Sequence, residues 1–397
     1  MMTGDGQNLK LASRADPLPA TVAIGVVSEK DEDVLYTLHA STELRIVRVP
    51  VETGSAAHKT GKKPQQLSVR RQRLPLRPGW VVPTPRAAAF AHDCQLLLLG
   101  CAWDCSLKIF RTADCELLSS VVYHSSAISC IGLSEREEVL LLGSDDTNVS
   151  VWRLRRESAP TPPRGSSSDK GSGLVLDRPE WVFSEHSAEV TAVACNVDLD
   201  TIASASADAT IVLHSLRSGS YIRTITHDQH SPTALQGPGS LFASVSFTEL
   251  AVTAKNGCII SVYEGCYPGG AGTESELLLH SINGRLLNRV AVDAPLSQPV
   301  RLNGAAAGGG GALAWASERL TELMFTLEGS EVVLRDLHER PLHDLVRFQA
   351  QPGTGDAVSG VSMALADGGQ LYVGLSDGTV LRQKISGAIP RILRRKL

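Results

Sequence analysis

Two histidine–aspartate pairs are the residues of this chain whose types and spacing suit chemistry. Asp146 follows His124 by twenty-two positions, and Asp208 follows His186 by the same interval. A carboxylate that orients an imidazole is the arrangement that many enzymes use for general base catalysis. An active site is normally assembled once in a domain, whereas this interval occurs twice. The repetition therefore favours a structural role for both pairs.

The stretches that contain these pairs align with each other from end to end. His124 to Leu154 and His186 to Leu216 each contain a histidine, an apolar strand, a second apolar strand and the aspartate. A large ring follows each aspartate by six positions, Trp152 in the first stretch and His214 in the second. Repeats of this length and strand content are typical of the blades of a WD40-type β-propeller.

A third copy lies upstream, where Asp104 precedes Phe110 by six positions. In such a blade a histidine, a turn aspartate, a hydroxyl on the second strand and a ring on the third strand form one hydrogen-bonded set. The first stretch has Leu142 where the hydroxyl is expected, and the second has His214 at the ring position. The predicted turn-lock residues are His124, Asp146, Trp152, His186, Ser204, Asp208, Asp104 and Phe110.

The length of 397 residues fits one large domain. Blades of about 40 to 45 residues give a seven-bladed ring of roughly 300, and insertions supply the rest. We predict an all-β fold with a single propeller over residues 21–385 and a basic tail at 386–397. Residues 1–20 form an N-terminal segment. The outer strand of the last blade comes from this segment, around Asn8 to Ser13, or is absent.

Three segments interrupt the predicted ring. Residues 53–78 are a basic loop that also supplies an outer strand near Leu67, with a nuclear-import signal or a phosphoinositide patch as alternatives. Residues 157–177 are rich in Ser, Pro and Gly, and this composition predicts a disordered insertion because it buries too little apolar surface. Residues 303–311 form a Gly/Ala-rich loop.

The bulk composition excludes several classes of function. A formal net charge of −4 gives no general field for nucleic acid or an anionic membrane. The polar start and the lack of an apolar run of about 18 residues argue against a secretory signal and a membrane span. We therefore expect a cytoplasmic chain. Its eight cysteines show no CxxC pair, so we expect buried thiols and neither a metal nor a cofactor.

Several runs resemble, in order and spacing, the C-terminal propeller of BEACH proteins, the neurobeachin and beige group. The resemblance covers about Leu74 to Ile385, and it is carried by SVVYHSSAISCIGLS, GSDDTNVSVWRL, SGSYIRTI, LLLHSINGRLL, VVLRDLH and LYVGLSDGTV. It implies a scaffold in vesicle and lysosomal traffic, with at most peripheral contact on endosomal or lysosomal membranes. In that family a PH-like module and a BEACH domain precede the propeller. This chain lacks both, so we expect it to be a free-standing relative or a fragment, with a PH–BEACH module or trafficking proteins as partners.

The sequence lacks the motifs of common active sites. It contains neither a GxSxG elbow nor a GxxxxGK[ST] phosphate loop, and Gly308 to Gly311 does not open a helix. We expect no catalysis and keep a propeller enzyme as the remote alternative. A ubiquitin-ligase substrate receptor is the nearer alternative. Such receptors tend to carry Trp-Asp-x-Arg, and the run from Trp152 to Arg155 keeps the last arginine but not the aspartate.

Binding by a propeller takes place chiefly through loops at the rims of the ring. The residue before each turn aspartate lies on such a rim, which places Trp103, Asp145 and Ala207 there. The repeat pattern needs no core tryptophan at this position, and tryptophans are enriched at interface hot spots. We therefore predict Trp103 and Asp145 as partner-binding residues. The alternative is that Trp103 packs flat against the neighbouring blade, as Trp181 is expected to pack within an outer strand.

Overall fold

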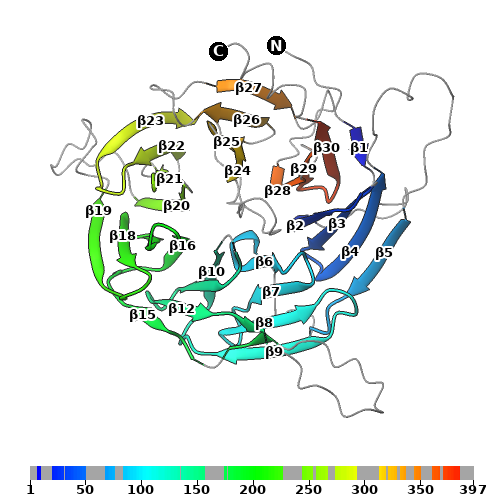
Figure 1. The fold of residues 1–397 in the computed structure, drawn as a ribbon, viewed down its shortest axis with the longest axis horizontal. Helices are drawn as coiled ribbons and strands as arrows, with labels where there is room; N and C mark the ends of the chain where they lie inside the picture. Colours follow the sequence, from blue (N-terminus) through cyan, green and yellow to red (C-terminus); the bar gives the residue numbers. More distant parts are fainter. Residues whose placement is uncertain are drawn as a thin grey trace.

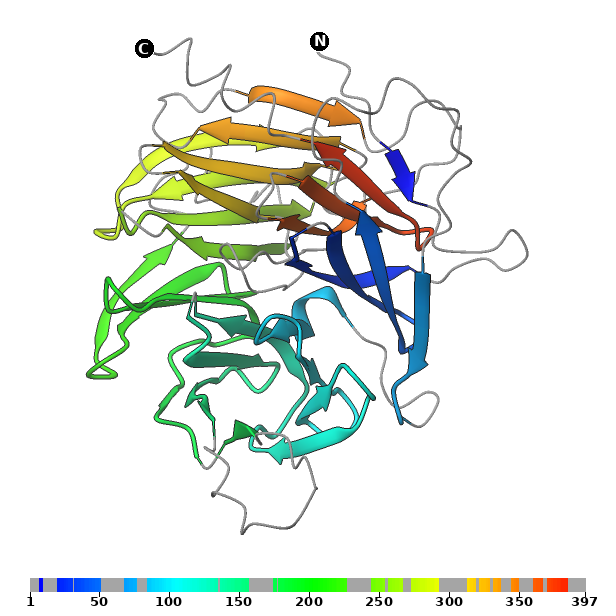
Figure 2. The same cartoon turned by 45° about the vertical axis from the view of Figure 1, so that its right-hand side comes forward.

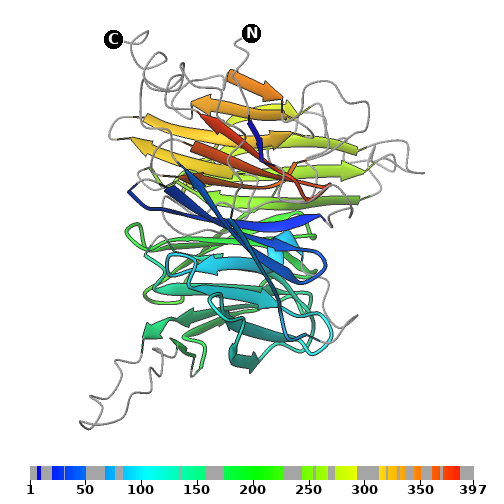
Figure 3. The same ribbon diagram turned by 90° about the vertical axis from the view of Figure 1, so that its right-hand side faces the viewer.

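The computed structural model shows a ring of antiparallel sheets (Figure 1). It describes residues 7–9, 20–30, 32–50, 68–76, 84–134, 136–156, 174–176, 178–226, 244–253, 256–266, 273–292, 313–318, 321–328, 331–336, 344–349, 360–366 and 370–384. Seven four-stranded sheets are present in this described part of the chain. Two further views show the sheets arranged around a common axis (Figures 2 and 3). The predicted all-β propeller is confirmed.

Each sheet is one blade. The first blade contains β2 (Thr21–Ser28), β3 (Glu32–His39), β4 (Glu43–Pro50) and β5 (Ser68–Arg73). The second contains β6 (Ala88–Ala91), β7 (Leu96–Gly100), β8 (Ser106–Arg111) and β9 (Leu117–Val122), and the short 3-10 helix η1 (Pro85–Ala87) precedes it. The third contains β10 (Ile128–Leu133), β11 (Val139–Ser144), β12 (Val149–Arg153) and β15 (Trp181–Phe183).

The remaining blades follow the same order along the chain. The fourth contains β16 (Val190–Asn196), β17 (Thr201–Ser206), β18 (Thr210–Ser215) and β19 (Tyr221–Thr226). The fifth contains β20 (Ser244–Val252), β21 (Ile259–Cys266), β22 (Thr273–His280) and β23 (Leu286–Val292). The sixth contains β24 (Leu313–Glu318), β25 (Thr321–Glu328), β26 (Glu331–Asp336) and β27 (Asp344–Gln349). The closing blade contains β28 (Gly360–Ala366), β29 (Gln370–Leu375), β30 (Val380–Lys384) and β1 (Gln7–Leu9).

The apolar runs of the sequence form the second strands of the blades. All residues of β7, β11 and β17 are buried. Both faces of these strands are covered by neighbouring sheets, so a continuous apolar run suits them better than alternation. The outer strands β5 and β9 contain only exposed and half-buried positions instead. The core therefore lies between blades.

The ring closes through the N-terminal segment. Gln7 of β1 pairs with Arg382 of β30, and Leu9 pairs with Val380. The expected strand was Asn8 to Ser13, and β1 shares Asn8 and Leu9 with that range. A buried hydrogen bond also joins the closing blade to the first blade, because the Tyr372 hydroxyl donates to Asp33 Oδ2 at 2.6 Å. No helix of the described residues is long and apolar enough to cross a membrane.

The structure differs from the predicted end of one loop. β13 (Arg155–Arg156) pairs with β14 (Leu174–Val175), and the half-buried Leu176 packs against the core between the second and third blades. The predicted disordered insertion, 157–177, therefore ends too late, because its last apolar residues find partners. The basic loop 53–78 includes β5, so the outer strand expected near Leu67 is present, and Leu74 is buried. Residues 51–67, 77–83, 157–173, 303–311 and 386–397 lie outside the described residues.

Trp181 lies on the outer strand β15, as the sequence predicted for a packing residue. Its Nε1 donates to the carbonyl oxygen of Leu216 at 2.9 Å. The indole covers Gly219, whose φ is +65°, and a Cβ at that glycine would lie 2.4 Å from the ring. Glycine is therefore required at this turn both for the backbone conformation and for the close approach.

Candidate functional site

The histidine–aspartate pair of the third blade belongs to a hydrogen-bonded series of four residues. His124 Nδ1 lies 3.0 Å from Asp146 Oδ2, and His124 Nε2 lies 2.7 Å from Ser150 Oγ. Trp152 Nε1 donates to the same Ser150 Oγ at 2.8 Å. His124 and Trp152 are buried, and the ring of Tyr123 meets both edge-on. Both imidazole nitrogens are therefore occupied by neighbours in the same blade.

Ser150 was missed by the sequence reasoning, which expected a hydroxyl on the second strand and found Leu142. The structure corrects this. Leu142 and Ser150 are directly opposite each other on β11 and β12. In the fourth blade the corresponding pair is Ser204 on β17 and Val212 on β18. The hydroxyl thus changes strand between the two repeats but stays within one cross-strand pair. The signal was the Ser-x-Trp spacing on the third strand.

Asp146 is held as a carboxylate by the turn itself. The backbone amides of Ser125 and Asn148 donate to its two oxygens at 2.8 and 3.0 Å. Burial raises the pKa of Asp146, but these amides and His124 outweigh it and keep the pKa below its usual value. A carboxylate that accepts several hydrogen bonds in a turn fixes that turn.

The fourth blade repeats this arrangement with one substitution. His186 Nε2 lies 2.8 Å from Ser204 Oγ, and Nδ1 lies 3.1 Å from Thr210 Oγ1. Asp208 is 3.5 Å from the imidazole, so the Thr210 hydroxyl, which donates to Asp208 Oδ1 at 2.5 Å, connects the two. The Ser187 amide also donates to Asp208. Burial raises the pKa of Asp208, but these hydrogen bonds hold it below its usual value, whereas burial lowers the pKa of His186.

His214 takes the place of the tryptophan in this blade. Its ring stacks on Phe183 with centroids 3.8 Å apart and planes inclined by 8°, and Tyr221 meets it edge-on. Nε2 lies 3.4 Å from Glu185 Oε1. Burial lowers the pKa of His214 despite that carboxylate. An aromatic stack therefore substitutes here for the hydrogen bond that an indole makes in the third blade.

The second blade has a different turn. Asp104 Oδ1 accepts from Ser106 Oγ at 2.6 Å, and Lys108 pairs with the other carboxylate oxygen. Burial raises the pKa of Asp104, but Lys108 and Ser106 outweigh it and lower the pKa. Phe110 is buried in the hydrophobic cluster shared with the first blade. Asp104 thus lies in a polar turn and Phe110 in an apolar core, so the two do not belong to one hydrogen-bonded set.

These hydrogen-bonded sets stabilise turns, and their geometry leaves few polar atoms available to bind a substrate. His124, His186 and their two aspartates are engaged by neighbours within their own blades, whereas His214 stacks on Phe183 of the third blade. A search of the described residues finds no group of three or more histidine, cysteine, aspartate or glutamate side chains placed to hold a metal ion. Cys94, Cys101, Cys115 and Cys130 are buried.

The turns between second and third strands gather at one end of the blades. We call this end, with Trp103, Asp145 and Ala207, the Trp103 rim. Trp103 is 70% exposed, which leaves most of the indole in solvent and does not fit a ring packed flat on a neighbouring blade. Asp145 is also exposed as a residue, although its carboxyl is partly buried. This partial burial, together with the nearby carboxylates of Glu189 and Asp146, raises the pKa of Asp145. The rim therefore carries an exposed indole on the second blade and an exposed carboxylate on the third.

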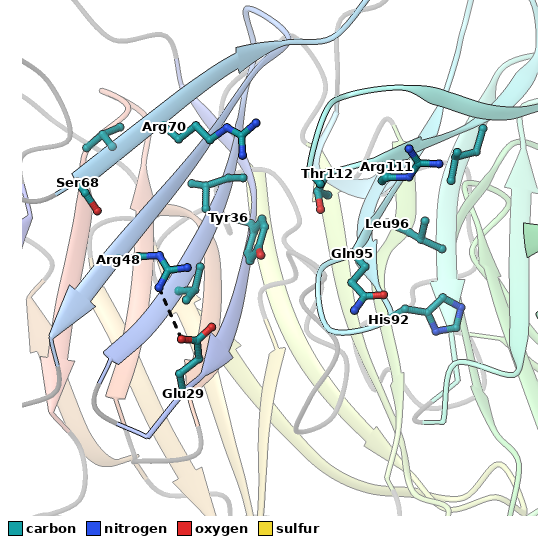
Figure 4. Close-up of a pocket in the computed structure, with 15 residues that line it drawn as sticks. Glu29, Tyr36, Arg48, Ser68, Arg70, His92, Gln95, Leu96, Arg111 and Thr112 are labelled. Carbon is teal, nitrogen blue, oxygen red and sulfur yellow. Dashed lines mark ion pairs between the residues drawn. The ribbon is translucent and has the colours of Figure 1, made fainter. Parts of the chain in front are cut away.

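A cleft of about 690 Å³ lies between the first and second blades (Figure 4). Side chains of β3, β4 and β5 form one wall, and residues around the turns of the second blade form the other. Among them are Tyr36, Arg48 and Arg70 on the first wall and Leu96 and Arg111 on the second. Sequence reasoning missed this cleft. The cluster of three arginines in β5 was the available signal.

The chain matches a family model described as the neurobeachin beta propeller domain over residues 86–298, more than half of its length. The resemblance predicted from the sequence is confirmed there. BEACH domain-containing protein B of Arabidopsis thaliana is 26% identical over 217 residues, which are 49% of this chain and 8% of that protein. BEACH domain-containing protein lvsD of Dictyostelium discoideum is 26% identical over 153 residues, which are 35% of this chain and 5% of that protein.

Protein SPIRRIG of Arabidopsis thaliana is 30% identical over 124 residues, which are 31% of this chain and 3% of that protein. The chain thus spans less than a tenth of the length of these relatives. A chain of the crystal structure of the mitotic checkpoint complex has the same fold, with a TM-score of 0.54 and 12% identity over 97% of this chain and 98% of that one. At this identity the likeness concerns the fold alone.

Proposed function

Because the chain belongs to the neurobeachin β-propeller family, we propose that it is a protein-interaction scaffold without catalytic activity, whose partners bind at the Trp103 rim. The residues that suited chemistry in the sequence support this proposal. His124 and His186 are engaged in turn-stabilising hydrogen bonds within their blades. A general base needs a free nitrogen within reach of a substrate proton, and these imidazoles offer none.

The exposure of Trp103 carries the proposal. Large aromatic side chains bury most of their surface in folded proteins, and an indole that is 70% exposed leaves apolar area for a partner to cover. Tryptophan is also among the residues most often found at binding hot spots. The polar turn of Asp104, Ser106 and Lys108 holds the adjacent backbone in place.

The proposed setting is the cytoplasmic side of vesicle and lysosomal membrane traffic, with at most peripheral membrane contact. Three of the relatives carry the BEACH domain in their names. A PH–BEACH module is therefore the first partner to test, followed by trafficking proteins. Nucleic acid is not proposed as a partner, since the net charge is −4.

The test compares the capture of partners by wild-type protein and Trp103→Ala. Hot-spot truncations cost about 2 kcal/mol or more, so capture of the main partner should fall by about tenfold or more. The melting temperature should stay nearly unchanged, because the indole of Trp103 is largely solvated. Leu117→Ala is the matched control, since Leu117 is 43% exposed on the outer strand of the same blade and pairs with Phe110, at the end of the blade away from the rim.

The binding assay uses a recombinant PH–BEACH module and cell extract in parallel. Equal capture by Trp103→Ala and wild type contradicts the rim proposal. Loss of capture together with a melting temperature lowered by several degrees means that Trp103 is a packing residue. Specific recovery of a cullin adaptor, with no binding of the PH–BEACH module, would favour the ubiquitin-ligase receptor instead.

A further inference from the structure

The cleft between the first and second blades has an apolar wall with polar groups beside it. Tyr36 and Ile46 are paired across β3 and β4, and Ile46 is paired with Arg70 of β5. Side chains of cross-strand partners point to the same face of a sheet, so this row faces the second blade. Leu96 and Leu118 line the opposite wall. The two walls face each other in Figure 4. A volume of about 690 Å³ suits one or two large side chains of a ligand.

Positive charge is concentrated on β5. Its residues Arg70, Arg71 and Arg73 are exposed, and none forms an ion pair with a carboxylate of the described residues. The other arginines of the cleft are already paired. Arg48 pairs with Glu32 and lies 3.7 Å from Glu29, as Figure 4 shows for the second contact.

Arg111 is paired in the same way on the other wall. It lies 2.8 Å from Asp114 and 2.7 Å from Glu116. Of the three arginines that line the cleft, Arg70 of β5 is thus the one without an ion pair to a carboxylate of the described residues. Arg70 lies on the cleft face of β5, whereas Arg71 and Arg73 lie on its other face, so an extended anionic ligand paired along this strand would meet arginines on both of its faces.

β5 is also the free edge of its blade. Its only partner among the described strands is β4, so no described strand lies beside the other side of its backbone. An extended peptide can bind such an edge by forming backbone hydrogen bonds. Exposed arginines on an edge strand discourage pairing with neutral or basic strands and favour an acidic one.

We propose that this cleft binds an extended acidic peptide segment of a partner protein. One large apolar side chain of the segment enters between the walls of Ile46 and Leu118. Its carboxylates meet Arg70 on the cleft face of β5 and Arg71 and Arg73 on the other face, because the side chains of an extended segment alternate between the two faces. The turns that line the cleft, between first and second strands and between third and fourth strands, lie at the end of the blades opposite to the Trp103 rim. The cleft is therefore a second site, beyond the proposed function and independent of it.

The test is a selection of random peptides displayed on phage against the full chain. We expect the enriched peptides to share net negative charge and one large apolar residue. A synthetic peptide of the most enriched sequence should bind about tenfold or more weakly to the triple variant R70E/R71E/R73E, and its affinity should fall with added salt. Ser68→Trp adds bulk to the cleft wall without changing charge and should weaken binding as well.

Arg217→Glu is the matched control, because Arg217 is an exposed arginine at a turn of the fourth blade. This variant should bind the peptide normally, and melting curves of all variants should agree within a few degrees. Trp103→Ala should bind the peptide normally too, which separates this site from the Trp103 rim. Vesicles of phosphatidylcholine with phosphatidylserine form a second arm.

The proposal is overturned if no peptides are enriched, if the enriched peptides are neutral or basic, or if R70E/R71E/R73E binds them as wild type does. It is also overturned if vesicles bind through the three arginines while acidic peptides do not, since the surface would then recognise lipid. Binding that survives Ser68→Trp contradicts the insertion of a side chain into the cleft.

Discussion

Ser150 lies directly opposite Leu142, and its hydroxyl connects His124 to Trp152. The direction of each hydrogen bond follows from the groups at the two ends. An indole only donates and a carboxylate only accepts. Trp152 therefore donates to Ser150, Ser150 donates to His124 Nε2, and His124 Nδ1 donates to Asp146. A neutral imidazole satisfies this chain, which ties the third strand to the turn and to the loop that enters the blade.

Removal of the central hydroxyl should destabilise the third blade. Ser150→Ala leaves a buried imidazole nitrogen and a buried indole N–H without a partner, so the free energy of unfolding should fall by about 1 to 3 kcal/mol. Chemical denaturation followed by tryptophan fluorescence measures this loss.

The double variant Leu142→Ser/Ser150→Ala moves the hydroxyl to the strand where the fourth blade has it. It should recover part of the lost stability, because the two positions form one cross-strand pair. A Ser150→Ala protein as stable as wild type would show that the hydroxyl is dispensable. A double variant no more stable than Ser150→Ala would show that the two positions are not equivalent.

His214 should make stability depend on pH. Burial lowers its pKa in the folded state below the ordinary value of 6.5. As pH falls below about 6.5, the unfolded chain binds the proton first, so the free energy of unfolding decreases until the folded-state pKa is reached. His214→Phe keeps a ring against Phe183 and removes the titration.

The measurement is urea unfolding of both proteins between about pH 7.5 and about pH 5. The free energy of unfolding of wild type should decrease more steeply towards acid than that of His214→Phe. His186, whose pKa burial also lowers, should leave a residual slope in the variant. Equal slopes for the two proteins would contradict a neutral, buried His214 in the folded state.

The Ser/Pro/Gly-rich insertion should be replaceable up to the strand pair at its base. Exchange of residues 157–173 for a short Gly-Ser linker should change the melting temperature by a few degrees at most, since loop length contributes little once the ends are held. Extending the deletion through Leu176 should lower it further, because Leu176 packs on the core. Differential scanning calorimetry of the two deletions measures this difference, and equal melting temperatures would mean that the β13–β14 pair does not contribute.

Local sequence patterns predicted the parts of the fold that depend on one blade. The interval from His124 to Asp146 identified the repeat, and the apolar runs identified the second strands. Ser150 was missed because the expected hydroxyl position belongs to the opposite strand, and the two are equivalent only after pairing. The cleft was missed because it depends on how the outer strands of two blades separate. Leu176 was assigned to the insertion because its packing partners are far away in sequence.

The most direct test of the central claim maps where a partner binds. Hydrogen exchange of the backbone amides is compared between the free chain and its complex with the partner that Trp103→Ala fails to capture. We predict increased protection at the Trp103 rim, in the turns around Trp103 and Asp145, with the outer strands β9 and β19 unchanged. Protection confined to the outer strands, with the Trp103 rim unchanged, would contradict the proposed scaffold surface.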